Sequence, residues 1–186
     1  MARTASAEWK GDLMGGAGTV ALGSGAYEGK YSFATRFEEQ PGTNPEELLG
    51  AAHAGCFSMA LANSLAKAGF AATSVKTTAS VHLGKDDKGF LITRIDLDVV
   101  AAVPGVDNAT FQEHATNAKT GCIISRALAA NEITLTATLA KPQPSWRAST
   151  WCPGTRRTRV RSWPRSRRSA TTPSTCPMPA APRGSA

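Results

Sequence analysis

The chain of 186 residues lacks the features that define several classes of protein. It has no uninterrupted apolar run of about 18 residues, so we expect no membrane-spanning segment. Its N-terminus has no continuous hydrophobic core of the signal-peptide type. The four cysteines are few and widely spaced, unlike those of a small disulfide scaffold. We therefore expect a protein of the reducing cytoplasm, where a pair of thiols serves catalysis or redox sensing rather than structure.

Acidic side chains are missing from residues 142–186, and this divides the chain into two parts. Residues 1–141 hold 12 Lys and Arg against 14 Asp and Glu, a net charge of −2, whereas residues 142–186 hold nine Arg and no acid. The second part also contains eight of the 11 prolines and has no hydrophobic period, so it cannot bury a core. We predict a globular domain over 1–141 and a disordered, Arg/Pro-rich tail over 142–186.

Three interpretations of the tail stay open. Arginine with interleaved tryptophan is compatible with a nucleic-acid-binding arm, and a basic tail without a specific partner is a second possibility. We favour a third, in which a GC-rich gene has been read out of frame or past its stop codon, and we expect no nucleic-acid partner. A native product of 19.4 kDa from an intact reading frame would contradict the third interpretation.

The domain is organised around one long apolar helix. Asn44 is a suitable N-cap, proline and two glutamates follow it in the first turn, and Gly69 is a suitable stop. Between residues 51 and 65 nearly every side chain is small or apolar, so we expect this helix to be buried on most sides. Cys56 lies in its middle.

The rest of the domain separates into strand-like and helical stretches. Short runs and period-two alternation predict strands at Ala7–Trp9, Gly18–Leu22, Tyr31–Phe37, Thr73–Leu83, Phe90–Val103 and Glu132–Leu139. A further helix is predicted from Asp107 or Asn108 to about Lys119, with a helical turn opening at Cys122. Strands and helices in separate stretches predict an α+β domain. His82 has no second ligand at metal spacing, so we expect a surface residue and no metal site.

Cys56 and Cys122 both follow a glycine and lie in helical stretches. A free cysteine often packs as a small hydrophobe. However, charged residues are concentrated just before the long helix, and a thiol beside arginine or at a helix N-terminus ionises more easily to the reactive thiolate. If the fold brings the two thiols together, they make a nucleophile and a resolving residue.

Three strings, TRFEEQPGTNPEELLGAAHAGCFSMAL, AVPGVDNATF and AKTGC, closely resemble the osmotically inducible protein C (OsmC) branch of the OsmC/Ohr thiol peroxidases. The likeness runs from about Ala7 to Leu139, and His53 before Cys56 is typical of this branch. The resemblance implies antiparallel sheets packed on two long central helices in an intertwined homodimer. It also implies an enzyme without a cofactor that reduces organic hydroperoxides, and less efficiently hydrogen peroxide, in oxidative or osmotic stress.

By this resemblance, Cys56 is the peroxidatic residue and Cys122 resolves its sulfenic acid as a disulfide. Arg36 matches the family's active-site arginine, and Glu46 matches the acid that orients it. The resemblance implies an external dithiol as reductant, with lipoyl groups among the candidates. The family's usual Cys-Pro-Val-Ser is Cys-Ile-Ile-Ser from Cys122 onward. The missing proline removes a rigid helix start and bears on the speed of resolution.

Helix geometry restricts how these residues can meet. Ten residues place Glu46 about 15 Å from Cys56 along one straight helix, so the two cannot share one arginine. Either the helix breaks near Gly50 or Gly55, or a partner subunit contributes one of them. A break near Gly55 would also place Cys56 near a helix N-terminus, which favours its thiolate.

Apolar residues near these positions are candidates for a substrate pocket that would suit organic peroxides. They are Phe33, Phe37, Phe57, Met59 and Ile123, although such residues more often belong to a core. His53 shares a helix face with Cys56, and we favour a packed histidine over one that assists catalysis. Two rival functions stay open: a thiol redox sensor or binding module without turnover, and a basic-tail nucleic-acid binder with steeply salt-dependent affinity.

Overall fold

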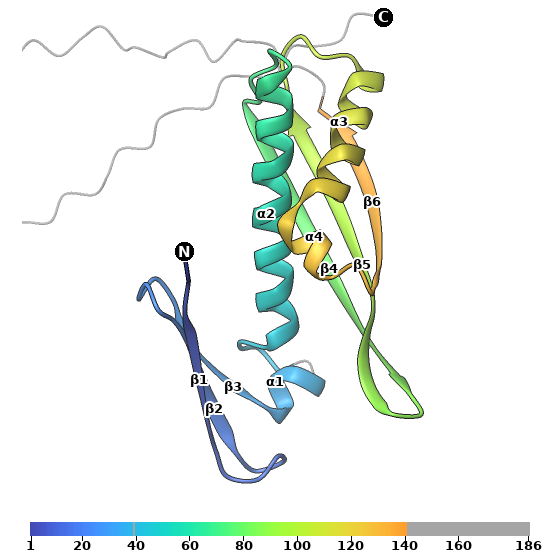
Figure 1. Cartoon of the computed structure of the whole chain (residues 1–186). Helices are drawn as coiled ribbons and strands as arrows, with labels where there is room; N and C mark the ends of the chain where they lie inside the picture. The colour runs from blue at the N-terminus through green and yellow to red at the C-terminus, as the bar shows by residue number, and fades with distance from the viewer. Residues whose placement is uncertain (39, 141–186) are drawn as a thin grey trace, which may run out of the picture. The chain divides into compact units, whose positions relative to one another are not determined.

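The structure of the protein, a computed structural model, describes residues 1–38 and 40–140, so the predicted tail lies outside the described residues. Figure 1 shows the elements in chain order. They are β1 (Ala5–Lys10), β2 (Ala17–Leu22), β3 (Glu28–Ser32), α1 (Phe33–Phe37), α2 (Pro45–Lys67), β4 (Ser74–Asp86), β5 (Gly89–Ala102), α3 (Asn108–Gly121), α4 (Ile123–Ala127) and β6 (Glu132–Leu139).

The first three strands form an antiparallel meander in the order β1-β2-β3. The predicted strand at Tyr31–Phe37 is wrong beyond Ser32, where the short helix α1 begins. Ser32 Oγ accepts a hydrogen bond from the Thr35 N–H at 3.2 Å, and Thr35 Oγ1 accepts one from the Ser32 N–H at 2.9 Å. This reciprocal capping box starts a helix where the strand pattern would otherwise continue.

Helix α2 is continuous over its 23 residues. Asn44 caps it through Oδ1, which accepts a hydrogen bond from the Glu47 N–H at 2.8 Å, and Gly69 follows its end with a φ of +89°. Of the two alternatives left open by the sequence, the helical break near Gly50 or Gly55 is therefore wrong. Cys56 lies in the middle of the helix, where an N-terminal dipole cannot favour its thiolate.

The second sheet has the order β4-β5-β6. Strands β4 and β5 form an antiparallel hairpin, as their alternation predicts, and β6 runs parallel to β5. The α+β class is confirmed, but this sheet is mixed rather than wholly antiparallel. The reason is that α3 and α4 intervene before β6, and such a crossover returns the chain in the same direction.

The core lies between one face of this sheet and the helices α2, α3 and α4, which lie along it in Figure 1. Strand β5 buries every second residue from Ile95 to Ala101. Helix α2 buries the positions Gly50, His53, Phe57, Leu61 and Leu65.

Only one face of α2 is buried within the chain, so the expectation that most sides are buried is wrong for a single protomer. Met59 on another face is 75% exposed. Within the described residues, α2 is also the one helix that is long and apolar enough to cross a membrane, by length and composition only. The sequence analysis expected no segment of this kind, and α2 is one by length and composition. The core helices of soluble proteins pass the same test.

Candidate active site

Cys56 and Cys122 lie next to each other in the fold. Cys56 projects from the middle of α2, and Cys122 is the N-cap residue of α4, 66 positions later in the sequence. Their Sγ atoms are 3.0 Å apart, and both cysteines are free thiols. Cys122 is 1% exposed, whereas Cys56 is half-buried. Formation of a disulfide between them therefore requires little movement of either helix.

The surroundings shift the pKa values of the two thiols in opposite directions. Burial and the contact with Cys122 raise the pKa of the Cys56 thiol, and the amides at the start of α4 offset this only in part. Burial also opposes ionisation of Cys122, but the contact with Cys56 and the amide and hydroxyl of Ser125 together lower its pKa. Within the residues that the structure describes, no positive charge acts on Cys56, although a reactive Cys56 thiolate needs one nearby.

Arg36 and Glu46 form an ion pair between α1 and the first turn of α2. The Arg36 Nη2 atom lies 2.8 Å from Glu46 Oε1, and Nε donates to the same carboxylate at 3.1 Å. The Arg36 side chain is 39% exposed and that of Glu46 14%. A fork-like contact of this kind fixes the direction of the guanidinium group, whose remaining N–H groups stay available to another anion.

The structure does not bring this ion pair to the sulfurs within one chain. Glu46 and Cys56 lie on the same unbroken helix, about 15 Å apart along its axis. None of the described contacts joins Arg36 to Cys56 or Cys122. Of the two solutions predicted from the sequence, the break in the helix is excluded and the contribution of a partner subunit is left.

The five predicted pocket residues separate into three groups. Phe33 and Phe37 stack near each other, with ring centroids 4.9 Å apart, and the Arg36 guanidinium lies 5.1 Å from the Phe37 ring centroid. Met59 and Ile123 are 75% and 74% exposed and belong to the elements that carry the cysteines. Phe57 is fully buried in the core, so its assignment to an open pocket is wrong.

An open groove beside Arg36 includes residues that sequence reasoning missed. It is lined by Trp9, Leu13, Tyr31, Ser32, Phe33, Arg36 and Phe37. Phe90, near the tip of the β4–β5 hairpin, extends the aromatic cluster, with its ring centroid 5.0 Å from that of Phe37. The residues that were missed are Trp9, Leu13, Tyr31, Ser32 and Phe90. They come from separate stretches of the sequence, so no local motif identifies them as a group.

His53 is a packed histidine, as we favoured from the sequence. It is fully buried, and its Nε2 lies 2.8 Å from Ser125 Oγ on α4. Burial lowers the pKa of His53 and so favours the neutral form of the ring. Ser125 itself was missed, because its proximity to His53 depends on the packing of α4 against α2.

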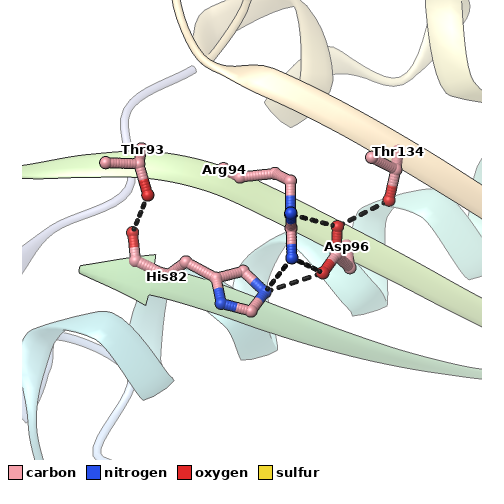
Figure 2. Close-up of polar contacts among 5 residues, drawn as sticks. All are labelled: His82, Thr93, Arg94, Asp96 and Thr134. Carbon is pink, nitrogen blue, oxygen red and sulfur yellow. Dashed lines mark hydrogen bonds and ion pairs between the residues drawn. The ribbon is translucent and has the colours of Figure 1, made fainter. Parts of the chain in front are cut away.

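A second polar cluster lies on the second sheet, as Figure 2 shows. His82 Nε2 lies 2.7 Å from Asp96 Oδ2, Arg94 Nε donates to Asp96 Oδ1 at 2.9 Å, and Thr134 donates to the same carboxylate. Hydrogen bonds from Thr134, His82 and Arg94 lower the pKa of Asp96 to about 2, against the effect of desolvation. Asp96 alternates with the buried residues of β5, so the cluster faces away from the sulfurs.

No group of three or more His, Cys, Asp or Glu in residues 1–38 and 40–140 is placed to hold a metal ion. Nor do the described contacts of His82 include a second histidine or a cysteine.

Comparison with known proteins gives consistent results. The model of the family described as OsmC-like protein matches residues 37–138. Two curated relatives, each called "Peroxiredoxin OsmC", come from Escherichia coli (strain K12) and Shigella flexneri. Each is 55% identical over 130 residues, which cover 69% of this chain and 90% of the relative.

Solved structures resemble the chain over a similar extent. The organic hydroperoxide resistance protein OhrB of Bacillus subtilis is 25% identical with a TM-score of 0.54, covering 74% of this chain and 98% of its own. An OsmC-like protein of unknown function from Vibrio cholerae has a TM-score of 0.60 at 18% identity, covering 74% of this chain and 99% of its own. The second likeness concerns the fold alone.

Proposed function

The chain belongs to the family of OsmC-like proteins, and from this premise we propose that it is a thiol-dependent peroxidase whose substrates are organic hydroperoxides and, less efficiently, hydrogen peroxide. The observation that carries the proposal is the distance of 3.0 Å between the sulfurs of Cys56 and Cys122. Two free thiols at this distance, one half-exposed and one buried, suit a peroxidatic and a resolving residue.

The proposed cycle has three steps. The Cys56 thiolate attacks the terminal oxygen of the peroxide, the O–O bond breaks, and the alkoxide leaves and takes up a proton, which gives Cys56 sulfenic acid and an alcohol. Cys122 then attacks the oxidised sulfur, an S–S bond replaces the S–O bond, and water leaves. A dithiol reduces the disulfide and becomes a disulfide itself.

The reductant is a dithiol rather than a single thiol, and a lipoylated protein is a candidate. The cycle needs both cysteines reduced between turnovers, so we place the protein in a reducing compartment, the cytoplasm. Cell fractionation with an antibody against the protein tests this placement, and recovery in a membrane or exported fraction would contradict it.

We propose that a homodimer supplies the positive charge that the described residues of one chain do not bring to Cys56. The pKa of Cys56 is raised in the single chain, so peroxidase activity requires a nearby positive charge. Arg36, held by Glu46, offers that charge but lies at the far end of α2. We propose that the partner subunit's Arg36–Glu46 pair reaches the sulfurs across the dimer interface, and that the aromatic groove beside Arg36 then receives the apolar part of the substrate.

The unburied face of α2 is the surface that a second copy would cover. It carries small residues and one large apolar side chain, at Ala51, Ala52, Gly55 and Met59. Small residues allow two backbones to approach closely, and Met59, which is 75% exposed, offers an apolar side chain for the partner to bury. Light scattering after gel filtration is expected to give the mass of two chains.

Steady-state consumption of cumene hydroperoxide in the presence of a dithiol tests the function. The full chain should turn over many times, Cys56→Ser should abolish consumption, and Cys122→Ser should leave one sulfenylation of Cys56 per chain. Disulfide formation without repeated turnover would favour the redox sensor. Steeply salt-dependent binding of nucleic acid, lost on truncation after Lys141, would favour the basic-tail reading.

Mixing two inactive variants tests the shared site. A dimer of Cys56→Ser with Arg36→Ala contains one complete site only if the cysteines and the arginine come from different subunits. Random exchange of a symmetric dimer should then restore about a quarter of the wild-type activity. If Arg36 serves the cysteines of its own chain, the mixture stays inactive.

A further inference from the structure

A second contact between α2 and α4 lies one helical turn from the sulfurs. His53 precedes Cys56 by three residues on α2, and Ser125 follows Cys122 by three residues at the start of α4. The His53 Nε2 and Ser125 Oγ atoms are 2.8 Å apart. His53 is 0% exposed and Ser125 4% exposed. The same two helices therefore hold a pair of sulfurs and, beside it, a buried polar pair.

Building on the proposed peroxidase function, we propose that the His53–Ser125 pair stabilises the negative charge on Cys122 whenever that sulfur acts as nucleophile or leaving group. Ser125 is the catalytic residue of the pair, because it lies in the first turn of α4, three residues after the N-cap Cys122. In this position its amide and hydroxyl, together with the amide of Ile124, lower the pKa of the Cys122 thiol. His53 is a positioning residue that acts through Ser125.

The burial of Cys122 makes such a group necessary. The residue is 1% exposed, so water does not solvate a charge on its sulfur. A hydroxyl that donates a hydrogen bond to the thiolate replaces part of that solvation, and the influence of Ser125 on the pKa of Cys122 has this direction.

The free nitrogen of His53 indicates how the ring is oriented toward Ser125. Its Nδ1 is buried and has no hydrogen-bond partner within the described part of the chain. With the proton on Nε2, the ring donates to Ser125 Oγ and leaves only an acceptor unused. The opposite tautomer would bury an N–H group without a partner, which is the rarer defect in proteins. With its oxygen occupied by His53, the Ser125 hydroxyl directs its own proton toward Cys122.

The negative charge on the Cys122 sulfur arises in two steps of the cycle. In resolution, Cys122 attacks the Cys56 sulfenic acid, an S–S bond forms, the S–O bond breaks, and the departing hydroxide takes the Cys122 proton to give water. In reduction, a thiolate of the dithiol attacks Cys56, the more exposed sulfur, and the S–S bond breaks with Cys122 leaving as thiolate. A stabilised leaving thiolate departs faster.

Single-turnover kinetics with cumene hydroperoxide separate the two oxidative steps. Sulfenic acid formation is followed by trapping with dimedone, and disulfide formation by acid quench, alkylation and mass spectrometry. Ser125→Ala and His53→Leu should slow disulfide formation about tenfold relative to sulfenic acid formation, the usual effect of losing one hydrogen bond to a charged group. Ser125→Thr and His53→Gln, which keep a hydroxyl and an N–H donor, should restore most of the rate.

The chain offers a matched control in another histidine–serine pair. Ser64 Oγ on α2 lies 2.7 Å from His114 Nδ1 on α3, away from the sulfurs. The double variant Ser64→Ala/His114→Leu should leave the ratio of the two rates unchanged. Because Ser125→Ala alone leaves the buried His53 ring without its partner, the double variant His53→Leu/Ser125→Ala serves as the second test, since removal of both partners costs less stability.

The pH dependence distinguishes stabilisation of charge from displacement of a helix. As the pH rises, a larger fraction of Cys122 ionises without the hydrogen bond, so the deficit of Ser125→Ala should shrink with increasing pH. The proposal is overturned if the rate deficit of Ser125→Ala stays constant with pH. It is also overturned if Ser125→Ala and His53→Leu/Ser125→Ala both form the disulfide at the wild-type rate. An equal deficit in the Ser64/His114 control overturns it as well.

A separate measurement keeps the proposal independent of the peroxidase function. The Cys56–Cys122 disulfide is formed with diamide, and its reduction by dithiothreitol is timed. Ser125→Ala should be reduced about tenfold more slowly than wild type because its leaving sulfur is less stabilised. Equal rates overturn the inference. In one outcome, wild type forms no sulfenic acid with any peroxide while its disulfide is still reduced about tenfold faster than that of Ser125→Ala. In that case the peroxidase function fails and the role of His53 and Ser125 stands.

Discussion

The two sulfurs and the Arg36–Glu46 ion pair belong to the same proposed site, but within one chain the sulfurs lie in the core and the ion pair lies near the surface. Cys56 and Cys122 meet inside the core, held by two helices that pack on each other. Arg36 and Glu46 meet near the surface, at the start of α2, about 15 Å away from Cys56. The two sulfurs of the buried half are thus brought together within one protomer, whereas the guanidinium of the exposed half contacts Glu46 and Phe37 but neither sulfur. This difference is what makes a shared site at a dimer interface the simplest account of the geometry.

The largest effect should come from weakening the core beneath the sulfurs. Phe57 follows Cys56 and is fully buried, so Phe57→Ala should lower the free energy of unfolding by about 3–5 kcal/mol. Urea unfolding followed by circular dichroism measures the change. Met14→Ala, at a loop position that is 66% exposed, is the control and should change stability by less than about 0.5 kcal/mol. Similar losses in both variants would contradict a thiol site built on the core.

Removal of the guanidinium group should affect activity rather than stability. Arg36→Ala should lower kcat/KM for cumene hydroperoxide by about 10²–10³, the usual effect of deleting a group that stabilises developing charge. Its unfolding midpoint should hardly change, because an exposed ion pair contributes little. Arg94→Ala, which removes an arginine paired with Asp96 on the other face of the sheet, is the matched control and should retain activity. Equal losses in both would show that net charge, not position, matters.

A smaller effect is expected from the residue that orients Arg36. Glu46→Gln keeps the shape of the side chain but removes the charge-assisted hydrogen bonds, so kcat/KM should fall about tenfold. Glu47→Gln changes a neighbouring glutamate in the same helical turn and should have little effect. If the two variants behave alike, the first turn of α2 acts through its dipole rather than through the contact with Arg36.

The smallest effect concerns the buried half of the site, where His53 makes the stability of the protein depend on pH. Burial lowers the pKa of His53 below its ordinary value of 6.5, so the unfolded chain binds a proton more readily than the folded one. The stability that neutral His53 contributes is present above pH 6.5 and lost as the pH falls below it. The thermal midpoint of wild type should therefore drop more between pH 7 and pH 5 than that of His53→Gln. Parallel curves would contradict a neutral, buried His53.

Local signals in the sequence account for much of the fold. The caps at Asn44 and Asp107 and the stop at Gly69 define helix ends through hydrogen bonds to the nearest few residues, and the structure has them where they are expected. Strand alternation likewise predicts the β4–β5 hairpin and β6. The capping box at Ser32 is also local, but the strand pattern of the neighbouring residues concealed it.

Proximity across long stretches of chain is a different matter. Cys56 and Cys122 could be named from motifs, but their distance of 3.0 Å depends on how α4 packs against α2. The same packing pairs His53 with Ser125, and although each stands in a motif, neither motif indicated that the two side chains meet. Phe57 looked like a pocket residue because hydrophobicity alone does not distinguish a core position from a lining position.

The sequence by itself determined the helix caps, the alternating strands and the chemical types of the side chains, because each depends on a few neighbouring residues. Tertiary structure decided which of those side chains meet. It placed a thiol against a thiol and a serine against a histidine, and it kept Arg36 apart from both because α2 runs unbroken between them. The physical reason is that contacts between distant segments arise from the joint burial of apolar faces, and no local pattern records which face will find which partner.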